Sequence, residues 1–306
     1  MAASLKRTEY YYNADNVLQN VAVWEFPEDN NAAKSAPPSS SSSGATKKYW
    51  LVFVHGGAWR DPRATFNEAE PTINALLDPS SPTTHHLPSA RTRVAGFASI
   101  NYRLSPHPSF AQDLATTPAF AARTARHPDH LDDVLSGLRF LQARFGFGGG
   151  YVLFGHSAGA CLSYQALLGG GGGDVALPVA AVGLEGIYDL VGLDERMGGA
   201  YSSFIEAAFG TDREGWRGAS PATAEGSFGG WSGGAGRLAV LAHSPDDELV
   251  DMPEVDAMER RLRGDGVSNV LVFRDLKGGH FDVLNDGSFA RVLVETLREL
   301  ERLDKA

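Results

Sequence analysis

The sequence predicts an α/β fold: a mostly parallel sheet with helices on both faces and a small cap excursion. Its short apolar runs, such as Leu51 to Val54, are continuous, which is typical of strands covered on both faces. They alternate with segments at helical spacing, and this alternation predicts right-handed crossovers between parallel strands. A chain of 306 residues, 43% of them hydrophobic, can bury one large core, so we expect a single domain over residues 1–306.

The expected elements follow in chain order. Strands are predicted at Val17 to Phe26, Leu51 to Val54, Val94 to Tyr102, Tyr151 to Phe154, Val179 to Leu184, Leu238 to Ala242 and Asn269 to Arg274. Residues Pro128 to Gly146 predict an amphipathic helix, with its apolar side chains on one face, and a further helix is expected at the C-terminus.

Two segments interrupt the alternation. Residues 27–48 are polar and carry a serine run, so they predict a disordered insertion between two strands and not a domain boundary. Residues 190–236 carry several aromatic side chains and a short predicted helix, Tyr201 to Phe209. We expect this second segment to form a cap and a pocket wall over the site, with simple packing onto the body as the open alternative.

The segment Gly155-His156-Ser157-Ala158-Gly159 lies between the strand Tyr151 to Phe154 and a predicted helix, Ala160 to Leu168. This context is required by a nucleophile elbow, in which a strained turn lifts a serine hydroxyl to the positive end of a helix. The turn closes only if the residues two before and two after the serine are small. Ser157 is therefore the predicted nucleophile of an α/β-hydrolase fold, and an incidental serine in a glycine-rich turn is the alternative.

The strand Leu51 to Val54 leads into His55-Gly56-Gly57-Ala58-Trp59, which resembles the oxyanion loop of lipases and esterases. Small residues let the backbone turn its N–H groups inward. Gly57 and Ala58 are thus the expected donors that complete an oxyanion hole with Ala158, and losing one such donor typically costs about 3 kcal/mol in the transition state. An ordinary Gly-Gly turn is the alternative.

In this architecture the nucleophile precedes the acid, and the acid precedes the histidine. Of the nine histidines only His243 and His280 follow Ser157. The carboxylates in the turn after the strand Leu238 to Ala242 all lie beyond His243, so chain order excludes it. His280, in a glycine-rich loop before the C-terminal helix, is the predicted general base.

Three adjacent carboxylates follow that strand: Asp246, Asp247 and Glu248. Only one of them can accept a hydrogen bond from the imidazole Nδ1–H. Asp247 stands three residues before Val250, so a side chain aimed at the site would be followed by one that returns to the core. The sequence favours Asp247 and leaves Asp246 open, and Glu248 is expected to cap or to face solvent.

Charge and cysteine content narrow the function class. A net charge of −10 argues against a nucleic-acid or anionic-membrane partner. The single cysteine, Cys161, excludes an intramolecular disulfide and is expected to pack in a helix. No signal peptide or membrane span is evident, so a cytoplasmic protein is expected, with monomer and homodimer both open.

Six motifs together resemble the fungal type of kynurenine formamidase, an α/β-hydrolase family, from about Trp24 to the C-terminus. They are His55 to Trp59, Asn101-Tyr102-Arg103-Leu104, His127-Pro128-Asp129-His130, Gly155 to Gly159, Gly186-Ile187-Tyr188-Asp189-Leu190 and Gly278-Gly279-His280-Phe281. The elbow and the oxyanion loop are common to many esterases. The third and fifth motifs and the acid loop are more discriminating.

The resemblance implies that the triad is Ser157, Asp247 and His280, that N-formyl-L-kynurenine is hydrolysed to kynurenine and formate on the route from tryptophan toward NAD, and that no metal or organic cofactor is needed. An aryl substrate needs apolar walls, for which Trp59, Tyr188 and Phe204 are the candidates. Two alternative functions remain open. One is a carboxylesterase of the hormone-sensitive-lipase type, and the other is a binding protein that kept the fold and lost catalysis.

Overall fold

The computed structural model describes residues 5–27, 47–78, 90–168, 173–233 and 236–305. Most of the predicted insertion, residues 28–46 of 27–48, lies outside the described residues.

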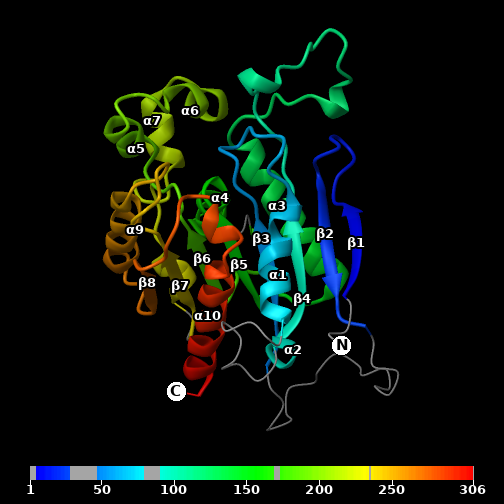
Figure 1. The fold of residues 1–306 in the computed structure, drawn as a ribbon, viewed down its shortest axis with the longest axis vertical. Coiled ribbons are helices and arrows are strands. Elements are labelled where there is room, and N and C mark those ends of the chain that lie inside the picture. The colour runs from blue at the N-terminus through cyan, green and yellow to red at the C-terminus, as the bar shows by residue number, and fades with distance from the viewer. Residues whose placement is uncertain (1–4, 28–46, 79–89, 169–172, 234–235, 306) are drawn as a thin grey trace.

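One eight-stranded sheet runs through the molecule in the order β1-β2-β4-β3-β5-β6-β7-β8 (Figure 1). The first two pairings, β1 with β2 and β2 with β4, are antiparallel, and all the others are parallel. The strands are β1 (Lys6–Tyr11), β2 (Asn20–Glu25), β3 (Tyr49–Val54), β4 (Val94–Ile100), β5 (Tyr151–His156), β6 (Ala180–Leu184), β7 (Leu238–Ala242) and β8 (Val270–Phe273).

Helices cover both faces of the sheet. In β3, Leu51 and Phe53 pack with α1 (Glu70–Leu77) and α10 (Ser288–Asp304), whereas Val52 and Val54 face the opposite layer. That layer holds α3 (Asp129–Phe145), α4 (Ala158–Leu168) and α9 (Met252–Gly264). Side chains of successive strand residues point to opposite faces, so a strand covered on both sides is apolar throughout.

The predicted mostly parallel sheet with helices on both faces is confirmed, and each predicted strand lies within two or three residues of an observed one. Strand β1 was missed. It is an edge strand that pairs only with β2, and none of its residues is fully buried, so its sequence, KRTEYY, lacks the apolar run that marks the other strands.

Two excursions gather at the top of the view in Figure 1. The first, predicted over residues 190–236, contains α5 (Leu190–Arg196), α6 (Ser202–Phe209) and α7 (Arg213–Ala219). The last helix of that segment, α8 (Gly229–Ser232), instead lies beside the start of β6, where Trp231 Nε1 donates to the Pro178 carbonyl at 2.9 Å. The second was not predicted. It connects β4 to α3 and contains the 3₁₀ turns η2 (Pro108–Phe110) and η3 (Ala119–Ala121). The remaining short elements are η1 (Phe66–Ala69), α2 (Ala90–Arg93) and η5 (Asp282–Leu284).

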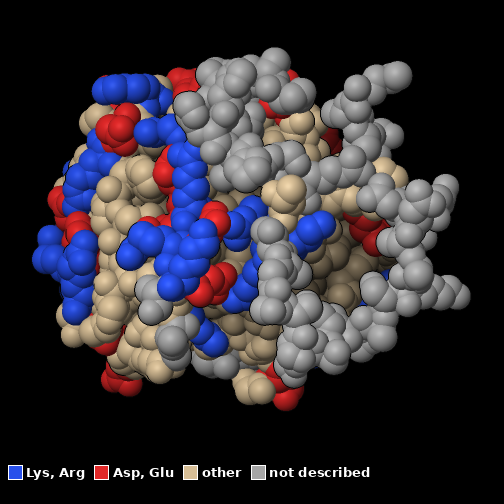
Figure 2. Space-filling model, turned by 90° about the horizontal axis from the view of Figure 1, so that it is seen from below, with Lys and Arg blue, Asp and Glu red and all other residues tan. Residues whose placement is uncertain are grey.

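Figure 2 shows Lys and Arg side chains gathered on the left of the face seen from below, with Asp and Glu side chains among them. Helix α10 carries such pairs along its last turns: Arg298 with Glu295, Arg302 with Glu299 and Lys305 with Glu301. Exposed pairs of this kind contribute little to stability, but each balances a basic side chain with a neighbouring carboxylate. No helix among the described residues is long and apolar enough to cross a bilayer.

Candidate active site

Ser157 lies at the turn between β5 and α4 with a backbone φ of 55°, in the left-handed region that non-glycine residues rarely adopt. A Cβ at Gly155 would lie 2.3 Å from the Gly159 carbonyl oxygen, and one at Gly159 would lie 2.0 Å from the Val54 carbonyl oxygen. Both contacts are impossible for a real side chain. The two glycines are therefore required by backbone packing, as the elbow interpretation predicts.

The loop after β3 is also strained, since Gly57, Ala58 and Trp59 all have positive φ. The Tyr102 hydroxyl donates toward the carbonyl oxygens of His55 and Gly56, at 3.1 and 2.9 Å, and thereby anchors the loop. This contact connects Tyr102 of the Asn-Tyr-Arg-Leu motif to the Gly-Gly loop.

The N–H of Gly56 donates to Glu68, whereas the N–H groups of Gly57, Ala58 and Ala158 have no acceptor within the described part of the chain. Backbone N–H groups are normally paired, so three unpaired ones around a serine elbow are free to bind an anionic oxygen. This arrangement agrees with the predicted oxyanion hole.

The structure brings Asp247 and His280 together, although 33 residues separate them. Asp247 Oδ2 accepts from His280 Nδ1 at 2.8 Å, and Asp247 Oδ1 accepts from the N–H groups of Leu249 and Val250. Burial acts to raise the pKa of Asp247, but the hydrogen bonds from His280 and the two amides lower it below its ordinary value. Asp247 is thus a carboxylate that holds the Nδ1 proton of His280 and leaves Nε2 as the basic nitrogen.

Ser157 and His280 line the same cavity, and no hydrogen bond joins them in the described structure. Such bonds are often long before substrate binds and tighten in the complex.

Two further buried histidines hold the loops that carry Asp247 and His280 in place. His156 Nε2 donates to the carbonyl oxygen of His280 at 2.9 Å, and His243 Nε2 donates to that of Val250 at 2.7 Å. Glu248, expected to cap or face solvent, accepts the backbone N–H of His280 at 3.1 Å. Asp246 is exposed, and its side chain has no hydrogen bond to His280.

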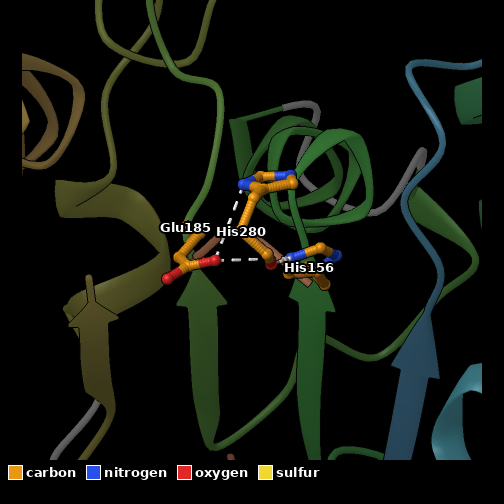
Figure 3. A group of neighbouring side chains, drawn as sticks. All are labelled: His156, Glu185 and His280. Atoms are coloured by element: carbon orange, nitrogen blue, oxygen red, sulfur yellow. Dashed lines mark hydrogen bonds and ion pairs between the residues drawn. The ribbon is translucent and has the colours of Figure 1, made fainter. Parts of the chain in front are cut away.

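Sequence reasoning missed Glu185, which lies directly after β6 with a φ of 47° and a fully buried side chain. Its Oε2 lies 3.5 Å from His280 Nδ1 and 3.6 Å from His156 Nε2. Neither carboxyl oxygen makes a hydrogen bond of good geometry among the described residues, although the backbone of Ser244 lies near enough to lower the pKa slightly. Figure 3 shows the carboxyl group between the two histidines. Burial, with the nearby charge of Asp247, raises the pKa of Glu185 to about 10, so the group is neutral at pH 7.

His156, Glu185 and His280 are the kind of set that can hold a metal ion, since their ligand atoms lie within 4.8 Å of one another. Here the nitrogens that face the carboxyl group already donate hydrogen bonds, His156 Nε2 to a carbonyl and His280 Nδ1 to Asp247. A protonated nitrogen has no lone pair to offer a metal. The cluster therefore belongs to the Asp247–His280 arrangement.

The neutral state of Glu185 predicts a pH-dependent stability. The unfolded chain loses this proton near its ordinary pKa of 4.5, while the folded protein keeps it up to about pH 10. Between these values the folded state binds one more proton, so its stability falls as pH rises. Glu185→Gln removes the titration and keeps the shape, and we expect its melting temperature to exceed that of the wild type by at least about 3 °C at pH 8 and by much less at pH 5.

Differential scanning fluorimetry across pH 5 to 9 measures this difference. Glu206→Gln, at an exposed position of α6, is the matched control and should follow the wild type throughout. Parallel pH profiles for Glu185→Gln and the wild type would contradict the prediction.

A cavity of about 230 Å³ opens over Ser157. Its apolar wall includes Ile187, Tyr201, Phe204, Leu249, Val250 and Phe281, and its polar lining includes Gly57, Ala58, Arg60, Asp61, His107, Ser157 and His280. Phe204, which the sequence offered as a pocket wall, lines this cavity.

Trp59 and Tyr188 were expected as walls, and the structure places both elsewhere. Trp59 is fully buried and packs edge-on against Phe209, 4.8 Å between ring centroids. Tyr188 is buried in the core beside Tyr164, over Gly183 and Gly186. A large aromatic side chain directly after a strand is usually buried. The sequence does not show whether it is buried in the core or in the wall of the pocket.

Curated fungal proteins resemble this chain over most of its length. A kynurenine formamidase-like hydrolase of Fusarium equiseti is 37% identical over 258 residues, which cover 82% of this chain and 83% of that protein. A kynurenine formamidase of Aspergillus versicolor is 34% identical over 77% of this chain and 84% of its own length. A kynurenine formamidase of Meyerozyma guilliermondii is 31% identical over 71% and 72%.

Solved structures show the same fold at low sequence identity. An esterase B from Lactobacillus rhamnosis has a TM-score of 0.65 at 14% identity and covers 99% of this chain and 88% of its own. A hormone-sensitive lipase from a metagenome library has a TM-score of 0.62 at 16% identity, covering 98% and 87%. No family model matches the chain.

Proposed function

Because this chain belongs to the kynurenine formamidase family of α/β-hydrolases, we propose that it hydrolyses N-formyl-L-kynurenine to L-kynurenine and formate with Ser157, His280 and Asp247 as its catalytic triad. The observation that carries this assignment is the buried 2.8 Å contact between Asp247 and His280 beside a cavity lined by the strained Ser157.

The first half of the reaction follows from that geometry. His280 Nε2 accepts the hydroxyl proton as Ser157 Oγ bonds to the formyl carbon, and the carbonyl π electrons move to its oxygen. The N–H groups of Gly57, Ala58 and Ala158 stabilise the resulting oxyanion. Collapse of this intermediate breaks the C–N bond, and the imidazolium gives its proton to the departing aryl nitrogen.

Water completes the cycle. His280 deprotonates a water molecule as it attacks the formyl ester of Ser157, and the same proton returns to Oγ when formate leaves. Asp247 stabilises the imidazolium in both halves and stays ionised, as its lowered pKa requires. These steps use side chains and backbone amides of this chain alone.

The cavity over Ser157 suits a planar aryl amide. Phe204 from α6, Tyr201 directly before that helix and Ile187 line a cavity of about 230 Å³, which is small for a long acyl chain. We propose that residues 190–236 act as the cap that supplies these walls, and that the reaction serves tryptophan degradation toward NAD in the cytoplasm.

Comparing substrates tests the proposal. We expect kcat/KM for N-formyl-L-kynurenine to exceed that for any p-nitrophenyl ester of four or more acyl carbons by at least about a hundredfold, or roughly 2.7 kcal/mol. The ester is the easier bond to break, so a preference for the amide must arise from contacts with the substrate. Steady-state assays of both substrates on one purified sample give the ratio.

The Ser157→Ala variant serves as the blank in both assays. Faster hydrolysis of butyrate or hexanoate esters than of the formamide would favour a carboxylesterase over the formamidase.

A further inference from the structure

A second cavity, of about 400 Å³, adjoins the one over Ser157. Arg60 and His107 line both cavities, so the two cavities meet at these side chains. The second cavity lies between the unpredicted excursion after β4, which contributes Pro106, Phe110 and Leu114, and helix α6. A substrate whose reacting bond lies at Ser157 and that extends in this direction meets Arg60 and His107.

Arg60 follows directly on the oxyanion loop, and its guanidinium has no ion pair or hydrogen bond among the described residues. Its guanidinium carbon lies over the Phe204 ring, 5.5 Å from the ring centroid. The neighbouring carboxylate, Asp61, pairs instead with Arg63 at 2.7 and 3.0 Å. A half-buried arginine that lacks a carboxylate partner can bind an anionic ligand without first breaking an ion pair.

The lining of the second cavity reinforces this charge. Arg123 also lines it, with a buried Nε that has no partner in the described structure, and no Asp or Glu is among its lining residues. Burial, with the nearby charge of Arg60, lowers the pKa of His107, so the positive charge of this lining comes mainly from the two arginines. In a protein of net charge −10, a cavity lined by two arginines and no carboxylate favours an anion.

We propose that Arg60 binds the α-carboxylate of an aryl amino-acid substrate, with the aryl ring against Phe204 and the side chain directed into the second cavity. The proposal rests on the proposed function for the identity of the aryl group. Planar guanidinium geometry matches a carboxylate in a two-point contact, and the Phe204 ring holds that plane in place. Arg60 is then a specificity-determining residue, separate from the triad.

Binding of the product tests the proposal without relying on turnover. Isothermal titration calorimetry measures the Kd of L-kynurenine for Ser157→Ala and for the double variant Ser157→Ala/Arg60→Met. We expect the second Kd to be at least about thirtyfold weaker, and the Kd of kynuramine, which lacks the carboxylate, to differ by less than about threefold between the two. Equal loss for both ligands, no loss, or no binding of L-kynurenine to Ser157→Ala would overturn the carboxylate contact.

Kinetics with the active protein give an independent readout. Arg60→Met should lower kcat/KM for N-formyl-L-kynurenine by about thirtyfold, mainly through KM, and should leave N-formylkynuramine nearly unchanged, while Arg60→Lys restores part of the loss. Arg139→Met removes the same charge from an exposed position of α3 and should match the wild type. A wild type that does not hydrolyse the formamide refutes the proposed function, and calorimetry then still decides the role of Arg60.

Discussion

Replacing Ser157 by alanine is expected to reduce kcat for N-formyl-L-kynurenine by at least about ten-thousandfold, and His280→Ala is expected to have a comparable effect. The serine supplies the atom that bonds to the formyl carbon, and the histidine carries the proton in both halves of the reaction. Because the two act as one unit, the double variant should lose little more than either single variant. The residual rate would come from the free N–H groups of Gly57, Ala58 and Ala158.

Single-turnover assays with purified variants measure these losses, and circular dichroism verifies the fold. Ser163→Ala, at a buried serine of α4 that donates to the Gly159 carbonyl, is the matched control and should keep wild-type turnover. An active Ser157→Ala variant would refute the nucleophile, and an active His280→Ala variant would refute the base.

Asp247→Asn is expected to reduce kcat by about a thousandfold, whereas Asp246→Asn should stay within about threefold of the wild type. The carboxylate of Asp247 accepts three hydrogen bonds, from His280 Nδ1 and from the amides of Leu249 and Val250. An amide in its place would favour the other imidazole tautomer, with the proton on Nε2, and His280 would no longer be a base toward Ser157. Asp246 is exposed, so its neutralisation changes only a distant charge.

Both variants remove one negative charge from the same loop. A difference in kcat between them therefore reports the role of Asp247 in the reaction and not a general effect of the lost charge on stability. Steady-state kinetics from pH 5 to 9 and a melting temperature for each variant are the measurements. If Asp247→Asn kept the kcat of the wild type and Asp246→Asn lost most of it, Asp246 would be the acid of the triad. The serine mechanism would remain in place.

Local patterns in the sequence determined the fold class and the catalytic candidates. A strand covered on both faces must be apolar at every position, so β3, β5, β6 and β7 are visible as continuous runs. The elbow is visible because backbone atoms lie within 2.3 Å of where a Cβ would stand at Gly155 or Gly159, which leaves glycine as the only residue that fits. Chain order then singled out His280, since the order of these residues is a property of the linear sequence.

Tertiary structure alone decided which side chains surround Asp247 and His280. Glu185 is one carboxylate among 37 acidic residues, and only the packing of β6 against the loops of Asp247 and His280 buries it without a hydrogen bond of good geometry among the described residues. The excursion after β4 has no strong periodicity, and its role appears only because it folds toward α6 and encloses a cavity with Arg60. Burial, unpaired charge and cavity lining depend on residues brought together from distant parts of the chain, and such contacts leave no local pattern for a sequence to display.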